Sequence, residues 1–361
     1  MNAELFELYK NMIRCRAVSS DIDAVNKSEK LLSAFLQKQG FHCTEEMING
    51  RVVVYASTRP GKVQDLLLNA HVDVVPAAYE EQFEPRMEGD ILYARGAHDC
   101  LGNLMAIVQC MLNAGDKYSI GAIFTADEEI GGRTTAGMVE RGYGARKAAL
   151  VVDAGGYGKI CYAQKGIIIL TLKATGVGGH ASAPWNLDNP IDKLIDGYNR
   201  FRSAWTNPDA NNTWLDSMTP CILRAGEADN AIPDTAEMTL NIRFTTDEAR
   251  DRIINMAKEL TGLDVRIGKN CLPVVMDPET PEIQLLGKAF ETADPEHPLS
   301  FYRMMGATDA RHLKELGIPI GIIGVAGGGA HGKKEYLELP SIDVCANVML
   351  EYARLLSAEE K

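Results

Sequence analysis

The stretch DLLLNAHVDVV, residues 65–75, decides the fold class. Three leucines follow its first residue, and two groups that bind metals or protons, His71 and Asp73, lie toward its end. Continuous apolar runs of this kind are typical of strands buried on both faces of a parallel sheet. Positions i and i+2 of a strand share a face, so the strand would place His71 beside Asp73, whose carboxylate could fix the second ring nitrogen of a metal-binding imidazole. A solvated strand end is the alternative interpretation.

Similar segments flank this stretch along the first half of the chain. They are RVVVYAST (51–58), IGAIFTADEE (120–129) and AALVVDAGG (148–156). Helical apolar spacing precedes them at about residues 23–40, and a second helix is expected at about residues 101–114. Alternating strands and helices predict an α/β fold with a central, mostly parallel sheet flanked by helices.

The pattern changes after Gly166, where the order becomes β-α-β-β-α-β, which is that of a ferredoxin-like unit. The expected strands are 167–175, 220–227, 236–245 and 264–268, and the expected helices are 190–204 and 247–260. The α/β pattern then resumes with a helix from about Pro281, a strand at 318–325 and a final helix at about 342–356. We therefore predict a discontinuous main domain, residues 1–165 and 275–361, with an inserted domain at 166–274.

The composition is that of a globular protein, and the length of 361 residues suggests two domains. A net charge of -12 repels nucleic acid and anionic membranes, so neither is an expected partner. The eight cysteines have no CxxC pair, which favours reduced thiols. The first residues resemble an amphipathic helix and not a secretory signal, and no apolar run is long enough to span a membrane, so we expect a cytoplasmic protein.

Carboxylates follow the other predicted strands. Asp99, in YARGAHDCLGN, stands at the start of a helix, where a helix N-cap is the alternative interpretation. Glu128 and Glu129 are adjacent at a strand end, which costs free energy unless a cation or a shared proton relieves the repulsion. One of them could bind a metal while the other takes a proton from water, and a polar turn is the alternative. Asp153 again follows an apolar strand, and ligands gather at the carboxyl ends of parallel strands.

His331 lies in VAGGGAHGKKEY, after the strand at 318–325. The glycines do not form a GxxxxGK[ST] phosphate loop or a GxGxxG unit between a strand and a helix, so nucleotide binding is not expected. An inserted domain explains how a residue so far along the chain returns to the same sheet.

Together these phrases resemble the cocatalytic zinc peptidase and deacylase family, which includes aminoacylases, acetylornithine deacetylase, succinyl-diaminopimelate desuccinylase, glutamate carboxypeptidases and tripeptide aminopeptidase. The resemblance runs from the first helix to the last. The phrases that carry it are LLLNAHVDVVP, LYARGAHD, FTADEEIGG, VVDAGG, GGHASAP, NAIPDTAEMTLNIRF, MGATDARHL and AHGKKEYLEL. Each is moderately specific, and their shared order makes the signal strong.

The resemblance implies a role for each metal-site position. Asp99 should bridge two metal ions, with His71 and Asp153 completing one site and Glu129 and His331 the other. Asp73 should orient His71, and Glu128 should be the general base. Zinc suits such a mixed site best, with cobalt and manganese as alternatives. The resemblance also implies a cis peptide bond between Asp99 and Cys100.

The resemblance implies further roles for the inserted domain as a lid and dimerisation domain. His180 should polarise the scissile carbonyl from the partner subunit of a homodimer, and Asn230 and Arg243 should hold a substrate carboxylate. Gly306 and Thr308 should line the pocket. From the residues alone, His180 would be read as a turn residue and Arg243 as a surface charge.

The sequence departs from the family pattern at three places. After the bridging aspartate the family usually has methionine or another residue and then lysine, whereas this chain has Cys100 and Leu101, which alters packing beneath the metals. Ala307 replaces a threonine found in some deacylases. Asp153 stands where deacylases and carboxypeptidases tend to have glutamate, which favours a peptidase acting on small peptides. An N-acyl-amino-acid deacylase is the second hypothesis. A non-catalytic relative is the third, and the presence of all five ligands and Glu128 argues against it.

Overall fold

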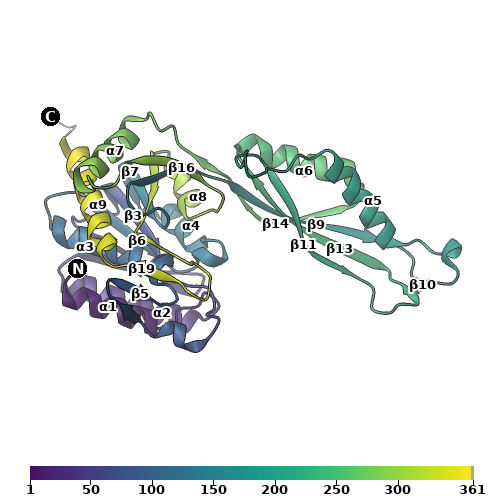
Figure 1. The fold of residues 1–361 in the computed structure, drawn as a ribbon, viewed down its shortest axis with the longest axis horizontal. Coiled ribbons are helices and arrows are strands. Elements are labelled where there is room, and N and C mark those ends of the chain that lie inside the picture. The colour runs from purple at the N-terminus through teal and green to yellow at the C-terminus, as the bar shows by residue number, and fades with distance from the viewer. Residues whose placement is uncertain (359–361) are drawn as a thin grey trace. The chain divides into compact units, whose positions relative to one another are not determined.

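The computed structural model describes residues 1–358, which divide into two compact units. Within the described residues, unit 1 comprises Met1–Tyr162, Met276–Tyr302 and the chain from Thr308 onward, and unit 2 comprises Ala163–Val275 and Arg303–Ala307. Strands β8 (Lys159–Gln164) and β16 (Ser300–Met304) run from one unit into the other (Figure 1). The short segment 303–307 thus belongs to unit 2, whereas the sequence pattern had placed it in the main domain.

Unit 1 is built on a large sheet whose central strands are parallel. The nine-stranded sheet has the order β1-β2-β6-β3-β7-β17-β8-β15, with β16 paired to β8. Strand β3 (Val63–His71) is parallel to both β6 and β7, and β17 is parallel to β7, whereas the edge strands pair antiparallel. The other bounds are β1 His42–Ile48, β2 Arg51–Ser57, β6 Ile120–Thr125, β7 Gly144–Val152, β15 Val274–Val275 and β17 Ile320–Ile323.

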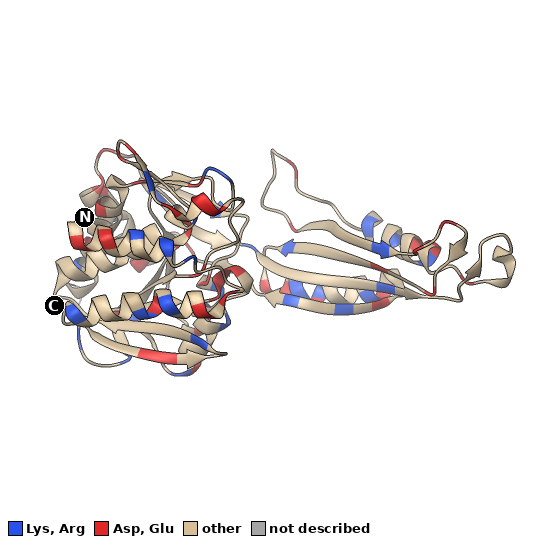
Figure 2. Cartoon of the chain, turned by 90° about the horizontal axis from the view of Figure 1, so that it is seen from below, with Lys and Arg blue, Asp and Glu red and all other residues tan. Residues whose placement is uncertain are grey.

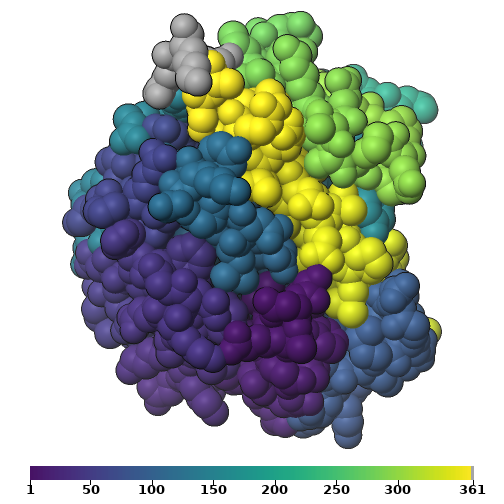
Figure 3. Space-filling model, turned by 90° about the vertical axis from the view of Figure 1, so that its left-hand side faces the viewer, coloured from purple at the N-terminus to yellow at the C-terminus, as the bar shows by residue number. Residues whose placement is uncertain are grey.

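Helices cover this sheet, as the α/β pattern predicts. Their bounds are α1 Ala3–Arg14, α2 Ile22–Lys38, α3 Asn103–Ala114, α4 Arg133–Glu140, α7 Pro281–Ala293, α8 Ala310–Leu313 and α9 Pro340–Ala358. Helix α9 packs on α3 and α7, and this layer contacts β3 and β17. Figure 3 shows α9 in yellow beside the green of α7, with the purple N-terminal segment near its lower end. The Met1 amino group lies 2.7 Å from an Asp343 carboxylate oxygen of α9.

Unit 1 also contains a second, smaller sheet of four short strands. Its order is β18-β19-β5-β4, with β4 Arg86–Glu88, β5 Ile91–Tyr93, β18 Gly327–Gly328 and β19 Tyr336–Glu338. Residues separated by more than 200 positions therefore pair directly, as Leu337 does with Leu92. The loop between β18 and β19 carries His331.

The structure shortens two of the predicted elements next to the site. Strand β3 ends at His71, so Asp73 lies beyond the strand and not on its face. Helix α3 begins at Asn103, and Asp99 lies in a separate wide turn, η2 (Ala97–Gly102), with non-helical φ and ψ. Asp99 is therefore not a helix cap. The Asp99–Cys100 peptide bond is cis, which confirms the expectation from the resemblance.

Unit 2 is a ferredoxin-like unit, as predicted. Its four-stranded sheet has the order β11-β13-β9-β14, all antiparallel, and α5 and α6 supply the two crossovers. A two-stranded sheet pairs β10 with β12. The bounds are β9 Gly166–Thr175, β10 Gly179–His180, α5 Pro190–Ser203, β11 Ser217–Ala225, β12 Ala231–Ile232, β13 Thr235–Phe244, α6 Asp247–Thr261 and β14 Asp264–Cys271.

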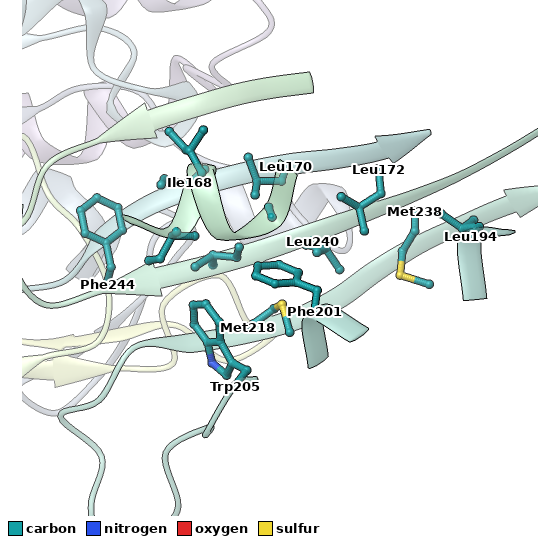
Figure 4. Close-up of a cluster of buried hydrophobic side chains, with 14 of the residues drawn as sticks. Ile168, Leu170, Leu172, Leu194, Phe201, Trp205, Met218, Met238, Leu240 and Phe244 are labelled. Atoms are coloured by element: carbon teal, nitrogen blue, oxygen red, sulfur yellow. The ribbon is translucent and has the colours of Figure 1, made fainter. Parts of the chain in front are cut away.

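The core of unit 2 lies between its sheet and its helices. Strand β13 alternates exposed or half-buried with buried side chains, the pattern of a sheet covered on one face. Phe201 of α5 is fully buried among Leu170 of β9 and Leu240 of β13, and its ring meets Trp205 edge-on (Figure 4). Unit 2 thus has a hydrophobic core of its own.

Charges of both signs alternate along the outer helices of each unit (Figure 2). Some form surface ion pairs within one helix, such as Arg354 with Glu351, which contribute little to stability. None of the helices within residues 1–358 has the length and apolar character required to cross a membrane. All eight cysteines are free thiols.

Candidate metal centre

Five side chains expected to bind metal converge beyond the carboxyl ends of the parallel strands of unit 1. His71 is the last residue of β3, and Asp153 follows β7 directly. Glu129 lies in a short turn after β6, η3 (Glu128–Ile130). Asp99 comes from the turn η2, and His331 comes from the loop between β18 and β19. Parallel strands end at one edge of the sheet, so residues distant in sequence meet there.

The first group surrounds the buried imidazole of His71. Its Nε2 atom lies 3.2 Å from Asp99 Oδ1 and 3.4 Å from Asp153 Oδ1. The Nδ1 atom lies 2.8 Å from the main-chain oxygen of Asp73. A carbonyl oxygen only accepts, so Nδ1 carries a proton and donates it, which directs Nε2 toward the two carboxylates.

The second group surrounds the imidazole of His331. Its Nε2 atom lies 3.1 Å from Asp99 Oδ2 and 3.1 Å from Glu129 Oε1. His331 is the most exposed of the five, with 56% of its side chain accessible, whereas Glu129 is 7% accessible. This group therefore lies on the open side of the cluster.

Asp99 belongs to both groups, because its two carboxylate oxygens face different histidines. Ligand atoms of His71, Asp99 and Glu129 also lie within 4.8 Å of one another. One carboxylate between two His/carboxylate sets is the arrangement expected for a bridging ligand of two metal ions.

Asp73 connects the first group to the turn after β6. Its carboxylate accepts hydrogen bonds from Ser19 Oγ at 2.6 Å and from the main-chain N–H groups of Glu128 and Glu129 at 3.0 and 3.4 Å. The nearest carboxylate oxygen of Asp73 is 3.4 Å from His71 Nδ1, farther than its own main-chain oxygen. Asp73 thus orients His71 chiefly through its backbone, and its carboxylate fixes the glutamate turn.

Glu128 is buried beside this cluster and contacts the guanidinium group of Arg311. Arg311 Nη2 lies 2.9 Å from Glu128 Oε1 and donates to the main-chain oxygen of Glu128 at 3.3 Å. Asp309 also lies beneath this turn and accepts hydrogen bonds from Thr125 and Thr135. Burial and the charge of Asp309 raise the pKa of Glu128 to about 8, against the lowering influence of Arg311. A carboxyl group that titrates near neutral pH is suited to proton transfer.

The pKa values of the cluster show how strongly its groups depend on one another without a cation. Burial would raise the pKa of Asp99, but hydrogen bonds from His331 and His71 hold it well below its usual range. Hydrogen bonds that His331 donates to Asp99 and Glu129 raise the pKa of His331 to about 10. Burial alone would lower the pKa of His71, but Cys100 and Asp153 raise it well above its usual range. Each imidazole is held beside carboxylates that require a positive charge between them.

These residues fit divalent metal ions. Neutral imidazole and carboxylate are ordinary ligands of zinc, cobalt and manganese, and a positive ion would replace the protons that the histidines otherwise carry. Cys100, whose sulfur lies near His71 and Asp153, is fully buried and donates to the main-chain oxygen of Val152 at 3.2 Å. Burial raises the pKa of its thiol, which disfavours the thiolate that a metal would bind.

The residues predicted to bind substrate lie mostly in unit 2. His180 is exposed on β10, where its Nδ1 atom lies 2.8 Å from Ser182 Oγ. Asn230 is close by, because its main-chain oxygen accepts from Ala181 N and β10 pairs with β12. Arg243 lies near the opposite end of β13 and donates to Asn241. Gly306 belongs to the 303–307 segment, and Thr308, in unit 1, is buried.

Sequence reasoning did not identify the buried polar residues that support the ligands. Arg95, Glu335, Asp309 and Arg311 are all largely buried, and all lie within motifs in which only other residues were assigned a role. A charged residue close in sequence to the proposed ligands indicates a possible supporting role, because a charge that is buried near the site needs a partner. The partner itself cannot be read from the sequence.

Comparison with known proteins agrees with this geometry. Residues 67–355 match the profile described as peptidase family M20/M25/M40. Succinyl-diaminopimelate desuccinylase of Nautilia profundicola is 23% identical, over 96% of this chain and 98% of that protein.

Two solved structures share the fold. The M20 family metallo-carboxypeptidase Sso-CP2 from Sulfolobus solfataricus has a TM-score of 0.80 at 16% identity, over 99% of this chain and 100% of that one. Bacillus subtilis YXEP, described as a dinuclear metal binding peptidase from the M20 family, has a TM-score of 0.68 at 15% identity, over 98% and 99%. The profile spans most of the chain, from β3 into α9. The chain therefore belongs to peptidase family M20/M25/M40, the metal-dependent peptidases and amidohydrolases that the sequence phrases resemble.

Proposed function

We propose that the protein hydrolyses an amide bond of a small peptide, using two divalent metal ions, with zinc as the first choice and cobalt or manganese as alternatives. The observation that carries the proposal is Asp99, whose two oxygens face two separate sets of ligands beside the buried Glu128. The proposed ligands are His71, Asp99 and Asp153 for one ion and Asp99, Glu129 and His331 for the other.

Two ions held in this way would supply Lewis-acid chemistry, lowering the pKa of water and polarising the scissile carbonyl. Glu128 accepts the proton of the attacking water on its carboxylate and delivers it to the leaving amine. Arg311, at 2.9 Å, holds one oxygen of Glu128, so the other is left for the proton. Asp73 holds the main chain of the same turn and, through its own carbonyl, the tautomer of His71.

We further propose that the protein acts as a homodimer in which His180 serves the partner's site. The geometry within unit 2 supports this. His180 pairs with Ala231, just before β13 begins at Thr235, and Arg243 lies eight residues along that strand. Eight strand residues span about 27 Å, and a dipeptide is only about 7 Å long. One copy of unit 2 therefore cannot bring both His180 and Arg243 to one small substrate, but two copies can.

Under this proposal His180 polarises the scissile carbonyl. Asn230, which comes from the same copy as His180, holds a substrate carboxylate together with Arg243 of the other copy. Gly306 and Thr308 line the pocket. Unit 2 is then both a lid and a dimerisation domain. We place the protein in the cytoplasm, because eight free thiols suit a reducing compartment.

A second candidate is hydrolysis of an N-acyl amino acid. It is favoured by a specific observation, since a relative aligned over nearly the whole chain is named a desuccinylase. The two reactions share the same ligands and the same base, and they differ in whether an acyl group or a free amine is accommodated at one end of the substrate.

A screen of free dipeptides and N-acyl amino acids tests the proposal. The purified chain is stripped of metal, reloaded with zinc, cobalt or manganese, and assayed by release of a primary amine. We expect turnover of dipeptides that requires added metal, and turnover of only N-acetyl or N-succinyl amino acids would favour the second candidate. A fully metal-loaded chain that cleaves neither class would refute both.

A further inference from the structure

We infer that Arg95 and Glu335 form a buried clamp that positions two metal ligands, Asp99 and His331, against each other. The inference rests on the proposed metal centre and adds two positioning residues to it. Both side chains are almost completely inaccessible, at 1% and 0%, and Arg95 Nη1 lies 2.5 Å from Glu335 Oε2. Burying a charge costs free energy unless the charge is paired and hydrogen-bonded, so the partners of this pair show what it holds.

The Glu335 carboxylate accepts hydrogen bonds from the segment that carries Asp99. Its Oε1 atom accepts from the main-chain N–H groups of His98 and Asp99, at 3.1 and 3.0 Å. Its Oε2 atom accepts from Gly96 N at 3.1 Å in addition to Arg95. Three main-chain donors within four residues of one loop therefore converge on one carboxylate.

Arg95 extends the clamp to the loop that carries His331. Its Nη2 atom donates to the main-chain oxygen of Gly332 at 3.1 Å, and Gln82 Nε2 donates to the same oxygen at 3.1 Å. Gly332 follows His331 directly, so the carbonyl beyond this ligand is held from two sides. The guanidinium fork thus contacts the carboxylate that fixes Asp99 and the peptide that fixes His331.

The backbone of His331 needs such support. Its φ is 62°, in the left-handed region that residues other than glycine rarely adopt. Without support, the loop would relax toward commoner backbone conformations. The His331 imidazole would then move away from Asp99, whose Oδ2 atom lies 3.1 Å from His331 Nε2. Because Asp99 and Glu335 are 236 residues apart in sequence, the separation of the two ligands depends on contacts across the loops.

The clamp is tested by metal binding to the metal-free protein. Glu335→Gln keeps the shape of the side chain but replaces one acceptor oxygen with an NH₂ group, which would face N–H donors. Arg95→Lys keeps the charge but loses the fork, so it cannot contact both Glu335 and Gly332. The exposed pair Arg86 and Glu88, on β4, provides matched controls in Arg86→Lys and Glu88→Gln. His331→Ala defines the effect of losing one ligand outright.

Cobalt binding is measured by visible absorption, and zinc binding by competition with a chelator. We expect wild type and both controls to bind two ions per chain, and both clamp variants to bind the weaker ion about 10–100-fold less tightly, the loss typical of groups that orient ligands. Arg95→Lys should affect the ion that His331→Ala removes, and Glu335→Gln should weaken both ions because it releases Asp99.

Wild-type affinity for both ions in the two clamp variants would overturn the inference. So would a lower unfolding temperature of the metal-free variants with unchanged metal affinity, since the pair would then be structural only. If Glu335→Gln does not fold, Arg95→Lys decides alone. Failure of the proposed function is separate, because it would appear as a wild-type chain that binds two ions without hydrolysing amides, whereas a wild-type chain that binds no divalent metal would refute the metal centre and the clamp together.

Discussion

Glu128 is held at the level of single atoms by groups that do not bind metal. Its main-chain N–H donates to Asp73, and its Oε1 atom lies 2.9 Å from Arg311. These contacts position the carboxylate whether or not it carries a proton. Its role can therefore be separated from that of Glu129, although the two residues are adjacent.

Replacement of Glu128 with glutamine should leave metal binding intact and reduce turnover. A general acid–base group contributes about 10²–10⁴-fold, so kcat should fall by at least that factor. Metal analysis of the purified variant by atomic absorption, beside an assay, checks both parts. Loss of one ion would show that Glu128 is a ligand and would remove its assignment as the base.

Metal affinity should rise with pH because metal and protons compete for the histidines. In the metal-free protein His331 has a pKa of about 10, raised by Asp99 and Glu129, so at pH 7 to 9 a metal ion must displace its proton. Each displaced proton makes affinity rise roughly tenfold per pH unit. Competition titrations at pH 7, 8 and 9 should show this slope, and His331→Ala should reduce it.

The stability of the metal-free protein should change with pH in the opposite direction, falling as the pH rises. A histidine whose pKa is raised in the folded state stabilises it fully below its ordinary pKa, and this contribution is lost as pH rises through the raised value. The metal-free protein should therefore lose the stabilising contribution of His331 between about pH 6.5 and pH 10. A melting temperature that falls no more steeply in wild type than in His331→Ala over this range would contradict the assignment.

The five proposed ligands could be selected from the sequence because each is a metal-binding residue type placed after an apolar strand or in a recognisable phrase, and the structure brings them together. The detailed contacts could not be predicted. Asp73 was predicted to orient His71 through a shared strand face, yet it does so chiefly through its main-chain oxygen. The spacing of residues predicts which way their side chains point only within a strand, and β3 ends at His71, before Asp73.

At the scale of elements, the long buried strands and the helices were predictable, and the short or exposed strands were not. Strands β2, β3, β6 and β7 are apolar over most of their length, whereas β1 (His42–Ile48) is mostly polar and exposed at the edge of the sheet. Strands of two or three residues, such as β18, are too short to show any period. They are fixed by pairing with distant segments instead.

Helix α5 provides a test of how independent the elements of unit 2 are from the metal centre. Phe201→Ala should destabilise unit 2 by about 3–5 kcal/mol, because the ring is fully buried in its core. Metal binding under native conditions should not change, since all five proposed ligands lie in unit 1. Calorimetric unfolding and a metal titration check the two statements.

Ile195→Ala is the matched control on the same helix. Its side chain is exposed, so its effect should stay within about 0.5 kcal/mol. A Phe201→Ala protein that binds metal more weakly, while Ile195→Ala does not, would show that the core of unit 2 is coupled to the ligands.

At the scale of the whole molecule, the shared-site dimer makes a quantitative prediction. His180→Ala and Glu128→Ala should each be nearly inactive, and a mixture unfolded and refolded together should regain about a quarter of wild-type activity. Random pairing makes about half of the dimers mixed, and each mixed dimer has one intact site of two.

Size-exclusion chromatography with differently tagged subunits shows whether exchange has occurred. Exchange without recovery of activity would mean that His180 acts within its own subunit or not at all. The insertion of one domain in another was predictable, because a complete ferredoxin-like pattern interrupts an α/β pattern. The proposed dimer rests on the family resemblance and not on any sequence pattern, since dimerisation depends on surfaces that no periodicity describes.

The division of unit 1 into separate stretches of chain has a consequence for the order of events during translation. Unit 2 is almost continuous, from Ala163 to Val275, so it can fold as soon as it leaves the ribosome. Unit 1 has to wait, because β17 at the centre of its sheet is synthesised after unit 2. Four of the five ligands emerge early, and His331 and the Glu335 that holds Asp99 emerge near the end. The nascent chain thus carries an incomplete set of the proposed ligands through most of its synthesis, so under the proposed function both ions could be held only by the finished protein.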